Sequence, residues 1–180
     1  IILDPVGVGA TEFRKDSINQ ILRVLKPSII KGNVAEIKAL SGLDTIKKGV
    51  DSVDTMEKRY KSVFMDLSLQ LGTVIAVTGK EDFITDGKRC CTIQRGTDLF
   101  TSISGAGCMT SSVLGAFGAV SDDMFKATVY GIYTMNICGE LAANCLKDVD
   151  GSGSFKVRLF DYINNIYKIE NLTEAGVLFD

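Results

Sequence analysis

Apolar residues recur at helical spacing in several stretches of this chain, and short apolar runs lie between these stretches. One helical stretch reaches from about Arg14 to Leu25 and stops before Pro27, because the residue before a proline is disfavoured in helical geometry. The polar segment from Ser41 to Val53 is predicted to be the least ordered part of the chain. The same spacing predicts further helices over Val34–Leu40, Met56–Leu71, Cys108–Val120, Asp123–Leu146 and Phe155–Lys168.

Runs rich in β-branched residues predict strands over Ile1–Leu3, Ser28–Lys31 and Thr73–Val77. The third run has almost no polar face, as a parallel strand covered on both sides requires. Residues Asp82–Thr85 and Arg89–Gln94 flank a turn, which predicts a β-hairpin. Strands that alternate with helices predict an α/β fold in three layers, with a largely parallel central sheet, helices on both faces and this one hairpin.

Composition narrows the kind of protein. The 180 residues are 46% hydrophobic, which is enough for one sizeable core. With 20 basic and 22 acidic residues, the net charge of −2 gives no electrostatic attraction to nucleic acid or to an anionic membrane. The apolar runs are too short for a transmembrane helix. Because the chain starts with Ile1 inside an apolar run, we expect it to be part of a longer protein.

The absence of histidine limits the possible chemistry. A chain with no histidine cannot form a Ser-His-Asp or Cys-His catalytic group, nor a Cys/His zinc site. A general base must then be a carboxylate, a thiolate or a lysine. The five cysteines form no CxxC pair, and their odd number suits a reducing compartment, so we expect a cytoplasmic protein. Phosphoryl transfer asks mainly for positioning and charge stabilisation, and it is compatible with this set of residues.

The turn Gly105-Ala106-Gly107-Cys108 directly precedes a predicted helix. Such a turn can direct several free N–H groups and the positive end of the helix dipole at one anion. It can also be a tight turn in which the glycines serve only packing. No GxxxxGK[ST] pattern and no GxGxxG after an opening strand occur in the chain, which disfavours a P-loop and a dinucleotide site.

Polar residues follow the predicted parallel strands at their carboxyl ends, where α/β folds bind ligands. Asp4 follows the first strand, Glu36 lies in the helical turn after the second, and Thr78 and Gly79 follow the third. Two carboxylates that face an anion site indicate Mg²⁺ shared with nucleotide phosphates. Alternatively, Glu36 only complements the dipole of its helix, and residues 78–80 form a simple turn into the hairpin.

Four segments together resemble the hydroxyethylthiazole kinase family of the ribokinase-like superfamily in order and spacing: residues 3–11 (LDPVGVGAT), 31–36 (KGNVAE), 77–79 (VTG) and 105–108 (GAGC). The resemblance implies transfer of the ATP γ-phosphate to the hydroxyl of 4-methyl-5-(2-hydroxyethyl)thiazole, in thiamine biosynthesis or salvage. It also implies that residues 1–180 are the C-terminal portion of one ribokinase-like domain, whose N-terminal part is absent from this chain.

The same resemblance implies residue roles. Asp4 and Glu36 would organise Mg²⁺, and Gly105 and Val8 would contact the thiazole substrate. Lys31, Asn33, Thr78 and Gly79 would bind ATP, although this family usually has arginine at position 31. The amides of Gly105, Ala106, Gly107 and Cys108 would form the anion hole.

Cys108 stands where most ribokinase-like enzymes have an aspartate base, and we expect it to assist the reaction without dominating it. The resemblance further implies a homo-oligomer, a trimer or a multiple of it, and allows fusion to a thiamine-phosphate synthase domain. Two alternatives stay open. One is a ribokinase-like kinase of a pyrimidine or pyridoxal alcohol, and the other is a nucleotide-binding assembly subunit without turnover.

Overall fold

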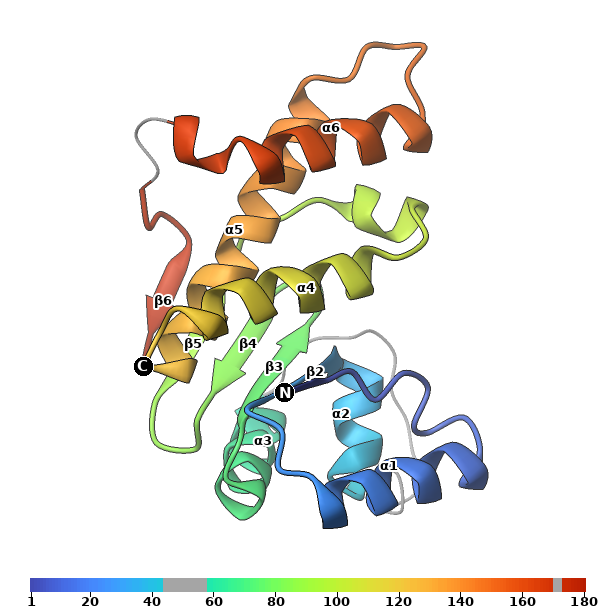
Figure 1. Cartoon of the computed structure of the whole chain (residues 1–180), viewed down its shortest axis with the longest axis vertical. Coiled ribbons are helices and arrows are strands. Elements are labelled where there is room, and N and C mark those ends of the chain that lie inside the picture. Colours follow the sequence, from blue (N-terminus) through green and yellow to red (C-terminus); the bar gives the residue numbers. More distant parts are fainter. Residues whose placement is uncertain (44–57, 170–172) are drawn as a thin grey trace.

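The computed structural model describes residues 1–43, 58–169 and 173–180. In these residues, six strands form one sheet, and their order in the sheet is their order along the chain (Figure 1). The strands are β1 (Ile2–Leu3), β2 (Ile29–Asn33), β3 (Val74–Thr78), β4 (Asp82–Thr85), β5 (Cys90–Ile93) and β6 (Val177–Phe179). The helices are α1 (Glu12–Val24), α2 (Val34–Leu40), α3 (Lys58–Leu71), α4 (Ala106–Ala119), α5 (Met124–Asn144) and α6 (Ser152–Asn164).

The sheet has a parallel half and an antiparallel half. Strands β1, β2 and β3 run parallel, whereas β4, β5 and β6 each pair antiparallel with the strand before them. The α/β class and the hairpin of β4 and β5 are therefore confirmed. The expectation of a largely parallel sheet is corrected for the described residues, because β6 adds a second antiparallel neighbour to β5. The carboxyl ends of β1, β2 and β3 lie at one edge of the sheet, and that of β5 joins them, because two successive antiparallel pairings give β5 the direction of β3.

Alternating strand residues bury two different faces of the sheet, as the period of a strand requires. Ile29 and Val74 contribute to a core beneath α4 and α5, and their chain neighbours Ile30 and Ile75 to a core beneath α2 and α3. Figure 1 shows the two groups of helices on opposite sides of the strands. The predicted three-layer arrangement is thus confirmed.

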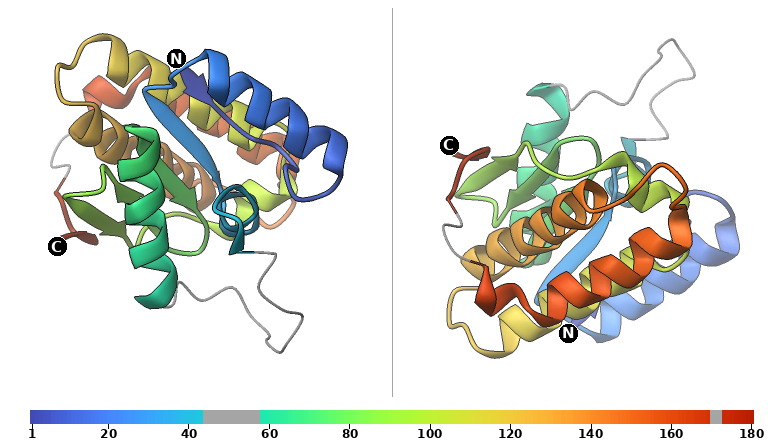
Figure 2. Two further views of the ribbon diagram at one scale, coloured as in Figure 1. Left: turned by 90° about the horizontal axis from the view of Figure 1, so that it is seen from below. Right: turned by 90° about the horizontal axis from the view of Figure 1, so that it is seen from above.

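Helix α5 is the central helix of its layer. Thirteen of its 21 residues are buried, and α6 lies outermost, packed against it (Figure 2). Phe155 and Leu159 of α6 share a third core with Met135 and Cys138 of α5. Cys138 is buried there. Within the described ranges, no helix combines the length and apolar character that a bilayer crossing needs.

Side-chain caps mark where helices α1, α2 and α5 begin. The Thr11 hydroxyl accepts a hydrogen bond from Arg14 N–H at the start of α1, and Asp123 does the same for Lys126 at the start of α5. Predicted helix bounds agree with the structure to within a few residues. The short 3-10 helix over Asp98–Ser102 and strand β6 were not predicted. The segment predicted to be least ordered falls largely in residues 44–57, outside the described residues.

Candidate active site

The carboxyl ends of β1, β2 and β3 place the first group of site residues. Asn33 and Thr78 are direct partners in the ladder of β2 and β3, and Asp4 directly follows β1. Lys31 lies two residues after Ile29, so its side chain emerges on the face of the sheet that α4 covers. The Lys31 Nζ lies 2.7 Å from Asp4 Oδ2 and donates to the Gly107 carbonyl at 3.3 Å.

The glycine turn lies directly over this ion pair. Gly105 has a φ of +89°, a left-handed conformation in which any side chain would be strained, and it precedes the first residue of α4. A Cβ on Gly107 would lie only 3.1 Å from Lys31 Nζ and 3.5 Å from Asp4 Oδ2. Glycine at 107 therefore permits the close approach of helix and ion pair. The first N–H groups of α4 have no intrahelical partner, as at every helix start, and are available to an anion.

The Glu36 carboxylate serves the backbone. Its Oε2 accepts from Asn33 N–H at 2.8 Å, and the Asn33 Oδ1 accepts from Glu36 N–H at 2.9 Å, which makes a capping box for α2. The Glu36 Oε1 accepts from Gly7 N–H at 3.0 Å and thus ties the loop after β1 to α2. Both carboxylate oxygens accept backbone hydrogen bonds, so Glu36 does more than complement the dipole of α2, and its part in metal binding stays a prediction.

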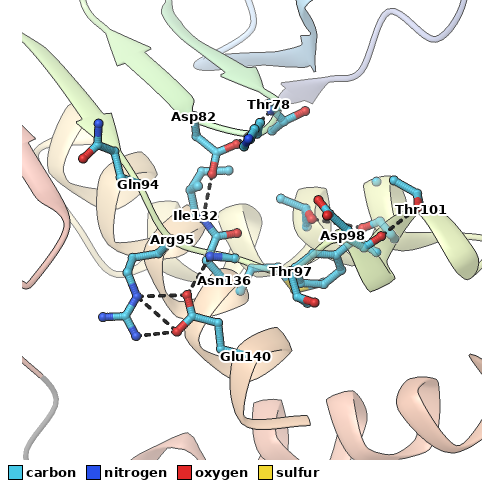
Figure 3. Close-up of a pocket in the computed structure, with 18 of the residues that line it drawn as sticks. Thr78, Asp82, Gln94, Arg95, Thr97, Asp98, Thr101, Ile132, Asn136 and Glu140 are labelled. Atoms are coloured by element: carbon cyan, nitrogen blue, oxygen red, sulfur yellow. Dashed lines mark hydrogen bonds and ion pairs between the residues drawn. The ribbon is translucent and has the colours of Figure 1, made fainter. Parts of the chain in front are cut away.

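A cavity of about 770 Å³ opens beside the glycine turn, between the strand ends, the loop after β5 and the middle of α5 (Figure 3). Five of the predicted residues line it: Lys31, Thr78, Gly79, Ala106 and Gly107. The others lie around it. Asp4 contacts Lys31 from behind, Asn33 and Glu36 cap α2, and Gly105 and Cys108 are exposed on the turn. Val8 is 1% exposed and belongs to the core, so it does not line this cavity.

Two polar pairs in the cavity wall were not predicted. Asp82, the first residue of β4, accepts from Gly79 N–H at 3.0 Å and from Asn136 Nδ2 at 2.6 Å. Burial raises the pKa of Asp82 to about 6, against the opposing effect of its hydrogen bonds and of the Lys31 charge. Because the Gly79 N–H is held by Asp82, it is not free to bind a phosphate.

The second pair joins the loop after β5 to α5. Arg95 and Glu140 form a bidentate ion pair, and Glu140 Oε1 also accepts from Gly96 N–H at 2.7 Å (Figure 3). The Arg95 hydrogen bond holds the pKa of Glu140 below its usual value. A signal for these residues exists in the sequence. Asn136 and Glu140 are polar at helical spacing i, i+4 in a largely apolar part of α5, which places both on one face of the helix.

The described residues bring together no group of three or more acidic, cysteine or histidine side chains around a common point. Asp4, whose side chain is 20% exposed, is the carboxylate next to the glycine turn. Magnesium commonly binds through one or two carboxylates together with substrate phosphates and water. Asp4 fits that pattern as a single protein ligand, whereas Glu36 fits it only through water.

A glycine turn that opens a helix over the ends of parallel strands, in a sheet covered on both faces, is the arrangement of the ribokinase-like fold. Pyridoxal kinase from Staphylococcus aureus shares this fold, with a TM-score of 0.53 at 18% identity over 77% of this chain. The chain belongs to the hydroxyethylthiazole kinase family, whose model matches residues 1–170.

Individual relatives agree with the family match. Hydroxyethylthiazole kinase of Alkaliphilus oremlandii is 41% identical over 165 residues, which are 92% of this chain and 61% of the relative. That of Thermoanaerobacter pseudethanolicus is 43% identical, over 92% of this chain and 62% of the relative. The structure of the Pyrococcus horikoshii protein of the same name superposes with a TM-score of 0.81 at 34% identity, over 100% of this chain and 64% of that one. This chain spans about three fifths of the length of the curated relatives that it matches.

Proposed function

We propose that this chain carries the phosphate-binding half of a hydroxyethylthiazole kinase, which transfers the ATP γ-phosphate to the hydroxyl of 4-methyl-5-(2-hydroxyethyl)thiazole. One observation carries the proposal. The glycine turn of α4 lies over the Lys31–Asp4 ion pair at the edge of a cavity of about 770 Å³. That volume lies within the range of about 300–1,000 Å³ typical of small-molecule sites.

The residues divide the work of phosphoryl transfer. The amides of Ala106, Gly107 and Cys108 donate to the transferred group, and the helix dipole favours its negative charge. Lys31 brings a positive charge to the floor of the cavity, and the Thr78 hydroxyl reaches the phosphates from the end of β3. The bond between the γ-phosphorus and the bridging oxygen breaks as the alcohol oxygen forms the new bond. ADP leaves with the electron pair.

The alcohol proton has to leave the oxygen as the phosphate ester forms. Cys108 is exposed on the first turn of α4, so its sulfur can take this proton, and water can do the same. A loose transition state needs little early deprotonation, and a weak base therefore suffices. This is why we assign Cys108 an assisting role.

Magnesium is part of the same proposal. Asp4 would hold the ion together with the nucleotide phosphates, and Glu36 would orient its water through the capping box of α2. The metal would neutralise phosphate charge.

The proposal also includes a cytoplasmic location, residues 1–180 as the C-terminal portion of one kinase domain, and a homo-oligomer, a trimer or a multiple of it. Fusion to a thiamine-phosphate synthase domain is compatible with it.

The test uses the full-length protein with ATP and Mg²⁺, and it follows ADP release. Hydroxyethylthiazole and hydroxymethylpyrimidine are supplied in parallel reactions. Release that depends on the thiazole supports the proposal. Release that depends only on the pyrimidine, or no release with bound ATP, would point to the other kinase class or to a binding subunit.

A further inference from the structure

A buried carboxylate lies in the wall of the cavity, where the proposed function places a triphosphate. Asp82 is 5% exposed, and Asn136, to which it is hydrogen bonded, is 8% exposed. Asp82 comes from the start of β4 and Asn136 from the middle of α5, 54 residues further along the chain. Figure 3 shows the two side chains pointing toward each other across the cavity wall.

Burying the ionised carboxylate of Asp82 in this wall costs free energy. A buried carboxylate loses its hydration, and a negative charge near a polyphosphate is repelled. Lys31 is the cation whose charge acts on Asp82. The other charged residues that line the cavity are Lys80, Arg95, Asp98 and Glu140. A neutral side chain of the same shape would avoid the cost of burying a charge. The charge of Asp82 is therefore not what favours it here, and its contribution to the cavity wall comes from its hydrogen bonds.

Those hydrogen bonds fix the turn that follows Thr78, which itself pairs with Asn33 of β2. The ladder between β3 and β4 ends at the pair Val77–Phe83, so it does not hold residues 78–81. The bond from Gly79 N–H to Asp82 Oδ1 closes that turn, and the bond from Asn136 to Asp82 Oδ2 joins the closed turn to α5. One carboxylate thus sets both the conformation of the turn and its distance from the opposite wall.

We propose that Asp82 is a positioning residue for the nucleotide, which holds the Thr78–Gly79 turn against Asn136 of α5 and so sets the width of the phosphate cavity. This inference rests on the proposed function, because it takes the cavity to be the nucleotide site. It assigns the contribution of Asp82 to its two hydrogen bonds. Its charge is then dispensable, and asparagine is a sufficient replacement, since the Asn136 amide can turn to present its oxygen.

Three variants of the full-length protein separate these contributions. Asp82→Ala removes both hydrogen bonds, Asn136→Ala removes only the link to α5, and Asp82→Asn keeps the shape without the charge. Asp161→Asn, an exposed carboxylate on α6, is the matched control. The KM for ATP and kcat are measured by ADP release with saturating hydroxyethylthiazole, and the Kd of MgATP by titration calorimetry.

Loss of a hydrogen bond to a charged group predicts an increase of about tenfold in KM and Kd for Asp82→Ala and Asn136→Ala, with kcat at saturation within about threefold of wild type. Asp82→Asn stays within about threefold on every parameter, and Asp161→Asn is unchanged. Should Asp82→Ala not fold, Asp82→Asn and Asn136→Ala together still separate the hydrogen bonds from the charge.

Three results overturn the inference: unchanged Kd in the alanine variants, a fall in kcat at constant KM, or a loss in Asp82→Asn as large as in Asp82→Ala. Failure of the proposed function looks different. The wild-type protein would then bind MgATP without thiazole-dependent ADP release, and the Kd values would still test the positioning role. A wild-type protein that binds no MgATP contradicts both.

Discussion

Lys31 and Asp4 form a nearly buried ion pair directly beneath the glycine turn, with Nζ and Oδ2 2.7 Å apart and side chains 5% and 20% exposed. Lys31 also donates to the Gly107 carbonyl, so the ion pair and the turn are one connected unit. We therefore expect Lys31 and Asp4 to contribute to the stability of the folded protein as well as to the proposed phosphoryl transfer.

Lys31→Met is predicted to lower the free energy of unfolding by about 3 kcal/mol, because it leaves the Asp4 carboxylate without its cation in a partly buried position. Chemical denaturation measures the loss, and ADP release should fall with it. Lys31→Arg keeps the charge and should retain the fold. Lys88→Met replaces an exposed lysine and should change stability by less than about 0.5 kcal/mol. Equal losses in Lys31→Met and Lys88→Met would show that the ion pair contributes nothing.

Gly107→Ala tests the close approach of α4 to the ion pair. The added Cβ would lie 3.1 Å from Lys31 Nζ, which is closer than ordinary contact, so the ammonium group has to move slightly relative to Asp4 and the turn. We expect activity to fall at least about tenfold, whereas stability changes by no more than about 1 kcal/mol, because alanine favours the helix. ADP release and thermal unfolding measure the two effects.

Gly115→Ala on the same helix is the matched control. Its Cβ would meet only Ile2 Cδ1, at an ordinary contact distance of 3.7 Å. This variant should keep its activity and gain stability of up to about 1 kcal/mol from helix propensity. A Gly107→Ala protein as active as Gly115→Ala would contradict the assigned role of Gly107.

The local part of the fold could be predicted from the sequence, and the reasons are physical. Helical spacing, Pro27 and the buried run of β3 are local patterns, and each gave its element nearly at its observed bounds. Strand β6 could not be predicted in this way. Residues 177–179 are too few to show a period, and they pair because β5 has a free edge that only the folded sheet presents.

In the candidate site, too, residues that follow local patterns could be predicted, and residues that depend on packing between distant elements could not. Asp4, Lys31, Thr78 and the glycine turn follow recognisable elements, so a parallel sheet was expected to bring them to one edge. The link between Asp82 and Asn136 depends on how α5 crosses the sheet, which no local pattern states. Glu36 illustrates a third case, since one residue pattern fits both a helix cap and a metal ligand. Its hydrogen bonds make it a cap, and its role toward Mg²⁺ stays a prediction.

Cys108 is expected to assist phosphoryl transfer without being essential. Cys108→Ala should lower kcat about tenfold at constant KM for ATP, which is less than the loss of about 10²–10⁴-fold expected for a dominant general base, and Cys108→Asp should retain or raise activity. Cys145→Ser is the control, because that thiol is also exposed but lies beyond the end of α5, away from the cavity. Complete loss of activity in Cys108→Ser, with the fold intact, would contradict the assisting role.

Asp82→Asn is predicted to stabilise the protein at neutral pH, although it removes a charge that is hydrogen bonded. Burial raises the pKa of Asp82 from 3.8 to about 6, so between these values the folded state binds more protons than the unfolded state. Its contribution to stability is therefore fully present below pH 3.8 and is lost as the pH rises to about 6. The complete loss, reached about one pH unit above the folded pKa, amounts to about 3 kcal/mol.

Denaturation of the wild-type and Asp82→Asn proteins at a series of pH values measures this effect as a difference. The free energy of unfolding of the variant, minus that of wild type, should grow by about 2 kcal/mol between pH 4 and pH 6 and level off near pH 7. Asp161→Asn should show no such growth, because that carboxylate is exposed in α6. A difference that does not change with pH would mean that Asp82 titrates alike in the folded and unfolded chains. Burial would then impose no cost on its charge.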